Sequence, residues 1–327
     1  MIASSAYVDL LDTEYLRTYI ASGGAAVKFV VPSSEAEAVM VTDGIESAAT
    51  AAGFGVVRVD GADVRIHMMD ELFFTIARQI DWNGLAQLAV ARAFTAVGCP
   101  MESDSRVIDS ALSTADAYRV GTVAARYNID QIELTRDVNR ELQSAVYHDY
   151  AMTGEFRTAM LRLCQAQLGS GQVSEPEATA VLDWLTGNLR QISLLKSALI
   201  FRRIARHSAR PMLFSLAHWL KVNGQDGLLI TIDIRRLGFS RRPSAAEREG
   251  LYYTKAALLD AYELLRQLID NTDELAGCCV VVVASPEFIT DPVRGVDIYQ
   301  ALKLRIFDEV RDQRRDNPFS SLVRVGG

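Results

Sequence analysis

Short apolar runs alternate with longer segments of helical periodicity, and this alternation constrains the fold more than any other feature of the chain. Segments such as 35–52, 68–80 and 252–271 carry apolar residues three and four positions apart, which is the period of an amphipathic helix. Strands that alternate with helices predict a parallel sheet covered by helices on both faces, and therefore the α/β class. The runs that read as buried strands are 25–31 (AAVKFVV), 55–59 (GVVRV), 227–232 (GLLITI) and 277–284 (GCCVVVVA).

A long stretch of helical pattern separates the second expected strand from the third. The pattern divides the chain into a first part of an α/β core at 1–84, a large helical insertion at 85–200 and a second part of the core at 201–327. A short helix at 13–22 precedes the first strand, a helix is expected at 298–311, and a last strand is expected at 321–325. Within the middle, helices are expected at 85–97, 107–127, 131–150, 155–168, 175–185, 194–207 and 211–221.

The composition is that of a globular protein, with 49% hydrophobic and 23% charged residues among 327. The first residues lack the basic stretch and apolar run of a signal peptide, and no segment is apolar enough to span a bilayer. We therefore expect a cytoplasmic protein. The histidines form no HExxH pair and the cysteines no CxxC pair, so we expect no metal site. The cysteines, Cys99, Cys164, Cys278 and Cys279, are expected to be small buried apolar residues.

An aspartate at the end of the third run points to nucleotide chemistry. In a P-loop NTPase, a strand leads into GxxxxGK[ST] and a helix, where glycines let backbone N–H groups wrap the phosphates. The motif's lysine balances phosphate charge, and its hydroxyl binds magnesium. A second strand ends in an aspartate that helps to hold this magnesium. The run GLLITID supplies Asp233, but Ile234 follows where a hydrolytic ATPase of the additional-strand type has a water-activating glutamate.

The segment after the first strand, PSSEAEAV, has the position of a phosphate loop and the wrong residues for one. Aligned without gaps, Pro32 and Glu37 replace the two glycines, Ala38 replaces the lysine, and Val39 replaces the hydroxyl residue. Glu37 would add negative charge beside a phosphate, and proline lacks a backbone donor. The alternative interpretation is an ordinary strand, turn and helix, with Ser33 or Ser34 as the N-cap.

Taken together, these segments resemble the P-loop ATP-binding proteins of BREX-type phage-defence systems. The resemblance covers about half of the chain and is carried by Tyr15–Val31, Gly53–Trp82, Ala209–Asp233 and Ala261–Ile306. It implies an AAA-like P-loop fold, a defence context and assembly with other subunits, and it places Ser285 where the family has a polar sensor residue. The family's ATPase activity is not carried over, because the phosphate loop has lost its residues and no acid follows Asp233.

The leading hypothesis is a catalytically degenerate ATPase-like subunit of a prokaryotic anti-phage defence complex. Such a subunit would act as a scaffold or regulator through protein contacts, without a cofactor, and its partners would be other subunits, including an active ATPase paralogue. One alternative is an active or composite-site ATPase that uses ATP and magnesium. A second is a DNA-binding module. The degenerate nucleotide site would comprise Pro32, Glu37, Ala38, Val39, Asp233 and Ser285.

Arginines cluster directly after the Asp233 strand, where α/β sheets present their ligand-facing loops. They can be solvated residues with internal ion pairs, a surface for an acidic partner or DNA phosphates, or arginines supplied to a neighbour's nucleotide. The net charge of −7 gives no overall support to nucleic-acid binding. The first-ranked cluster is Arg235, Arg236, Arg241 and Arg242, and two others lie at 202–210 and 311–315.

Overall fold

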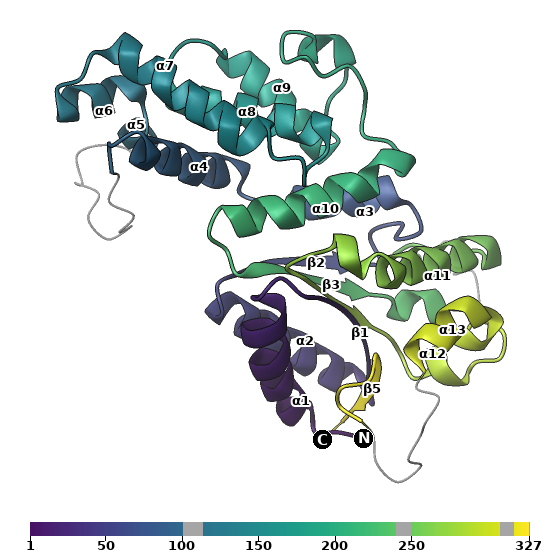
Figure 1. Ribbon diagram of the computed structural model, residues 1–327. Helices are drawn as coiled ribbons and strands as arrows, with labels where there is room; N and C mark the ends of the chain where they lie inside the picture. The colour runs from purple at the N-terminus through teal and green to yellow at the C-terminus, as the bar shows by residue number, and fades with distance from the viewer. Residues whose placement is uncertain (101–113, 240–249, 308–316, 327) are drawn as a thin grey trace. The chain divides into compact units, whose positions relative to one another are not determined.

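The computed structural model describes residues 1–100, 114–239, 250–307 and 317–326 (Figure 1). The chain forms two compact units. One combines Met1–Gln79 with Leu216–Gly327 and contains the sheet, and the other is Ile80–Ser215.

The sheet unit is built on five strands that all pair in parallel, in the order β2-β3-β4-β1-β5. The expected α/β class with a parallel sheet is confirmed, and each expected strand is present within one residue of its predicted ends. The interior strands β3 and β4 are buried along almost their whole length, as continuous apolar runs require. The strands are β1 (Ala25–Pro32), β2 (Phe54–Asp60), β3 (Gly227–Asp233), β4 (Cys278–Val283) and β5 (Leu322–Val325).

Helices cover both faces of this sheet (Figure 1). The helix α2 (Glu35–Ala51) leads from β1 across the sheet to β2, whereas α11 (Lys255–Asp270) leads from β3 to β4 in the opposite direction. Because such crossovers are right-handed, the two helices lie on opposite faces. On the α2 face lie α1 (Ser4–Leu10) and η1 (Leu11–Ile20), and α3 (Met69–Ala77) lies on the α11 face. The shorter elements are η4 (Arg235–Gly238), η5 (Thr272–Glu274), α12 (Glu287–Thr290), η6 (Val296–Ile298) and α13 (Gln300–Ile306).

One apolar core lies between the sheet and the helices α1, η1 and α2. It includes Leu16 and Ile45 from the helices and Val30, Leu229 and Val281 from the strands, all of them buried. The prediction of a short helix at 13–22 was wrong in two respects, the first residue of the helix and the type of helix. Helical structure begins at Ser4, and Leu11–Ile20 forms hydrogen bonds five residues apart, as a π-helix does.

Helices are the only regular elements among the described residues of the second unit. The helices α4, α7, α8 and α9 all contribute buried residues to its core. The rings of Trp82 and Phe156 meet edge to face with centroids 6.1 Å apart. The elements are α4 (Trp82–Ala96), α5 (Thr114–Ala117), α6 (Val120–Tyr127), α7 (Gln131–Leu142), η2 (Gln143–Tyr147), α8 (Gly154–Leu168), α9 (Glu175–Thr186) and η3 (Ile192–Leu195), followed by the first part of α10 (Arg206–Val222).

Two helix predictions for this unit need correction. Within the helix expected at 194–207, only Leu194–Leu195, at the end of η3, and Arg206–His207, at the start of α10, are helical. Leu199, between them, has a φ of 60°, which a right-handed helix does not contain. The helix expected to start at Pro211 starts instead at Arg206 and includes the proline, whose nitrogen cannot donate to the His207 carbonyl. The helix expected at 107–127 falls partly outside the described residues, and its described part is divided into α5 and α6.

All four cysteines are buried free thiols, as predicted. None of the helices in the described ranges combines the length and apolar character that crossing a membrane requires.

Candidate functional site

The strands β1, β3 and β4 end at one edge of the sheet, which is where open α/β sheets place their ligands. The last residues of β1 and β3 are Pro32 and Asp233, and Ser285 follows β4 by two residues. The parallel register therefore brings three residues of the predicted site to one edge. Gly61 belongs to this edge too, because its N–H donates to the Asp233 carbonyl at 2.9 Å and a Cβ there would lie only 2.8 Å from that oxygen.

The connection between β1 and α2 consists of only two residues. The Ser33 N–H donates to the Val325 carbonyl of β5 at 2.9 Å. The first backbone N–H after β1 is therefore already paired with the last strand. The Ser34 side chain accepts the Glu37 N–H at 3.3 Å and caps α2, which decides between the two serines proposed as caps. A phosphate cradle needs a longer loop whose N–H groups point at the ligand.

The positions that would carry the phosphate-binding residues lie in the first turns of α2. Glu37 accepts a hydrogen bond from the Ser4 hydroxyl. Ala38 is buried in the core at 2% exposure, and the Val39 side chain is 51% exposed to solvent. These positions therefore supply neither a cation nor a hydroxyl to the edge of the sheet.

The Asp233 carboxylate is held by an arginine of its own chain. Arg235 donates from Nε to both carboxylate oxygens at 3.0 and 2.9 Å and from Nη2 to one of them, and its backbone N–H donates to Oδ1 at 2.9 Å. Its Nη1 also forms an ion pair of 2.5 Å with Glu35, at the start of α2. The hydrogen bonds to Asp233 raise the pKa of the guanidinium, so Arg235 stays charged. A guanidinium therefore occupies the carboxylate that a magnesium ion would need.

The family model for the BREX system ATP-binding protein BrxC/D matches residues 17–326, which is nearly the whole chain. The chain belongs to this family. The resemblance predicted from the sequence is thereby confirmed, and membership indicates a component of a BREX defence system with other subunits of that system as partners. No curated protein and no solved structure matches the chain.

In this BREX ATP-binding family member, internal contacts hold the segment that follows β3. Arg236 donates from Nε to the Leu251 carbonyl at 2.8 Å, and its guanidinium lies 4.4 Å from the centre of the Phe239 ring. The buried Arg294 donates to the carbonyls of Leu237 and Tyr253 at 2.9 and 2.8 Å. Two of the four arginines expected to contact partners or DNA, Arg235 and Arg236, thus make contacts within the chain. The other two, Arg241 and Arg242, lie outside the described residues.

Two contacts were not predicted from the sequence. Glu35 forms an ion pair with Arg235. The Ser4 hydroxyl donates a hydrogen bond to Glu37. The spacing Asp233-Ile234-Arg235 could have indicated the ion pair between Asp233 and Arg235. Ser4 is 33 positions from Glu37, so no local pattern indicates their contact.

Ser285 lies close to the segment after β3, since a Cβ at Gly238 would lie 3.5 Å from the Ser285 hydroxyl. Within the described part of the BREX family chain, no group of three or more His, Cys, Asp or Glu residues is placed to hold a metal ion.

Proposed function

We propose that this BREX family chain is a subunit that does not hydrolyse ATP and acts as a scaffold or regulator through contacts with other subunits. The observation that carries the proposal is the guanidinium of Arg235 on the Asp233 carboxylate. Magnesium bound at this position would have to displace a charged arginine that is hydrogen-bonded to both carboxylate oxygens.

The loop after β1 supports the same conclusion. Its two residues leave no room for a ring of N–H donors, and one of these donors already pairs with β5. Glu35 and Glu37 stand at the start of α2, where their charges would oppose a triphosphate. Mg–ATP therefore does not fit the residues at this edge.

We further assign the sheet to the AAA-like type of P-loop fold and the helical unit to an insertion between β2 and β3. The support is the order of the strands, in which β4 lies between β1 and the Asp233 strand, and the position of the helical residues in the sequence. The fold would then be retained for assembly after the loss of hydrolysis.

Isothermal titration of the purified chain with Mg–ATP, together with a phosphate-release assay, tests the proposal. We expect no dissociation constant below about 1 mM, which corresponds to about −4 kcal/mol, and no turnover. The matched variant Arg235→Gln frees Asp233 but leaves the loop unchanged, so it too should not bind. Turnover by the wild-type chain that is lost in Asp233→Asn would overturn the proposal.

The family description and the retained Asp233 favour one alternative, a composite ATPase site completed by another subunit. In that case Asp233→Asn would reduce the ATPase activity of the assembled complex, although the isolated chain is inactive. Under the proposal, the same substitution leaves the activity of the complex unchanged.

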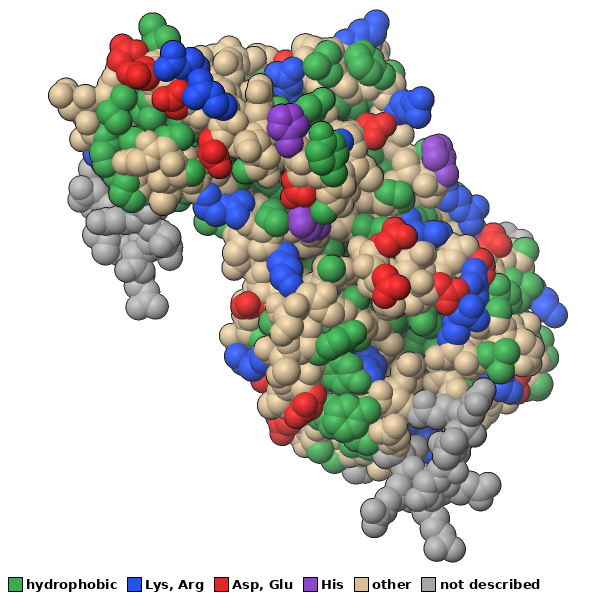
Figure 2. Space-filling model, viewed as in Figure 1, with side chains coloured by type: hydrophobic (Ala, Val, Ile, Leu, Met, Phe, Trp, Pro, Cys, Tyr) green, Lys and Arg blue, Asp and Glu red, His purple; other side chains and the backbone are tan. Residues whose placement is uncertain are grey.

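A DNA-binding role has less support. Figure 2 shows Lys and Arg side chains interspersed with Asp and Glu over the face in view, instead of one continuous basic surface. Binding to phosphates would show an affinity that falls steeply with salt concentration. Measurable duplex binding at low salt that is lost at about 200 mM salt would favour this role over the scaffold.

A further inference from the structure

The helical unit contains a cavity that no part of the proposed function uses. Its volume is about 540 Å³, within the range of roughly 300–1,000 Å³ that is typical of small-molecule sites. Its lining residues come from the start of α8, the end of α9, the segment before α10 and the first turns of α10. All of its lining residues belong to this one unit.

Part of the cavity wall is apolar and nearly closed to solvent. Trp184, Ile204 and Met212 are 3%, 6% and 3% exposed, and Pro211 lies beside them in α10. The Trp184 indole N–H donates to the Arg202 carbonyl at 2.8 Å, so its polar atom is satisfied. The wall therefore offers an apolar surface to the non-polar body of a ligand.

The remaining wall is polar, and three of its six residues are basic. Arg202, Arg203 and His207 line it, against a single acid, Glu155. Within the described part of the chain, the Arg202 guanidinium has no hydrogen-bond or ion-pair partner. The helix α8 also begins here at Gly154 without a side-chain cap, so its positive end adds to the local potential. In a chain of net charge −7, this concentration of positive charge favours an anion.

We propose that this cavity is a binding site for a small organic anion with an aromatic or aliphatic body. The body packs against Trp184, Ile204 and Met212, and a carboxylate, phosphate or sulfonate group is bound by Arg202 and Arg203. The site goes beyond the proposed function and does not depend on it, because none of its residues belongs to the edge of the sheet.

The probe pair 1-anilinonaphthalene-8-sulfonate and N-phenyl-1-naphthylamine tests the proposal, because the two molecules share one apolar body and only the first carries an anion. We expect the sulfonate to bind the full-length chain with a dissociation constant on the order of tens of micromolar. The neutral probe should bind at least about 10-fold more weakly. Energy transfer from tryptophan to the bound sulfonate should be reduced in Trp184→Phe, which locates the probe. Equal affinity of the two probes would overturn the proposal.

Substitutions at the rim separate this cavity from other apolar sites. Arg202→Gln combined with Arg203→Gln should weaken sulfonate binding about 10-fold, whereas Glu155→Gln should strengthen it. Arg140→Gln is the matched control, since Arg140 is a 72% exposed arginine of the same unit that does not line the cavity. Circular dichroism and the thermal midpoint report whether each variant is folded. Sulfonate binding that is unchanged in the folded double variant would contradict the assignment, and so would equal losses in that variant and in Arg140→Gln.

Discussion

At the scale of single residues, the edge of the sheet is defined by one arginine with two acidic partners in different environments. The side chains of Arg235 and Asp233 are 24% and 21% exposed, whereas the Glu35 side chain is 79% exposed. Solvent screens an exposed ion pair, and such pairs contribute little to stability. The Asp233 pair also has several charge-assisted hydrogen bonds, which are stronger than neutral ones.

Double-mutant cycles measure this difference. We expect Arg235→Gln and Asp233→Asn to be coupled by about 1–2 kcal/mol in the free energy of unfolding, because each substitution leaves the other partner unpaired. The coupling between Arg235→Gln and Glu35→Gln should stay below about 0.5 kcal/mol. Urea unfolding of the single and double variants provides the values. Couplings of equal size would show that the ion pair with Asp233 has no special strength.

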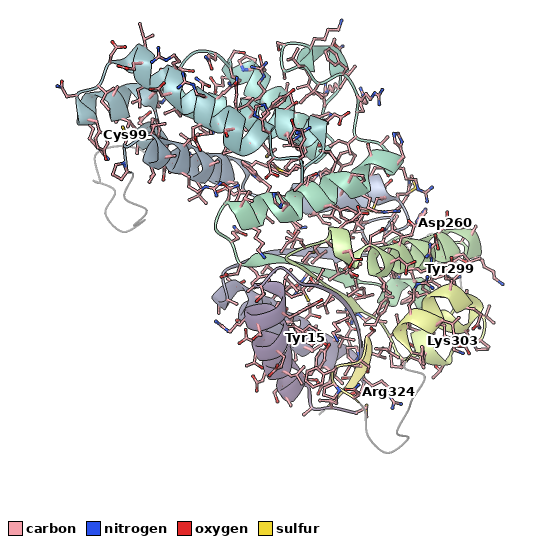
Figure 3. All side chains as sticks on the ribbon, viewed as in Figure 1. Tyr15, Cys99, Asp260, Tyr299, Lys303 and Arg324 are labelled. Carbon is pink, nitrogen blue, oxygen red and sulfur yellow. The ribbon has the colours of Figure 1, made fainter. Side chains whose placement is uncertain are left out.

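At the scale of elements, the start of α2 and the packing of α13 on α11 each depend on a few side chains. Ser34 caps α2 and thereby fixes the helix two residues after β1. On the other face of the sheet, Glu263 of α11 accepts hydrogen bonds from Arg266 and from the Tyr299 hydroxyl, which comes from the segment just before α13 (Figure 3). Each contact involves so few side chains that single substitutions can test it.

Removal of the cap should destabilise the sheet unit. We expect Ser34→Ala to lower the free energy of unfolding by about 1 kcal/mol, because the Glu37 N–H loses its acceptor, and Ser34→Asp to retain most of the stability. The neighbouring Ser33→Ala is the control, and its effect should stay within about 0.5 kcal/mol. Thermal or urea denaturation gives these differences. A larger loss for Ser33→Ala would assign the cap to the wrong serine.

The contact between α11 and α13 should weaken in acid. The hydrogen bonds from Arg266, and then those from Tyr299 and Gln267, lower the pKa of Glu263 from its ordinary 4.5 to about 2. Because the folded state lowers this pKa, the stabilisation is complete above about pH 4.5 and is lost as the pH falls towards 2. Stability measured from pH 7 to pH 2 should therefore converge for the wild type and Glu263→Gln. Arg266→Gln should cause a similar, non-additive loss at neutral pH, and parallel curves for wild type and Glu263→Gln would contradict this account.

At the scale of the whole molecule, the chain contains two compact units with separate cores. Leu229 in β3 and Leu163 in α8 are both fully buried, each in the core of its own unit. The edge of the sheet belongs to one unit and the basic cavity to the other, so substitutions at one site should leave the other site intact.

Calorimetry should resolve two unfolding transitions. Leu229→Ala should destabilise the sheet unit, and Leu163→Ala the helical unit, by about 2–5 kcal/mol each, because each change leaves a cavity in a closely packed core. Each substitution should lower the midpoint of one transition and leave the other unchanged. A single transition that shifts equally in both variants would show that the two units unfold as one.

The sequence by itself determined the α/β class, the five strands, most of the helices and the membership of the BREX family. These features depend on hydrophobic period and residue type along short segments, as in GLLITI at β3, and the absence of glycine and lysine from Pro32–Val39 needs no structure to be seen. Only the tertiary structure decided the strand order, the pairing of Ser33 with β5 and the ion pair between Arg235 and Glu35. It also decided the cavity beside Trp184. These features join residues far apart in the chain, and a local pattern of hydrophobicity does not encode which distant partners meet.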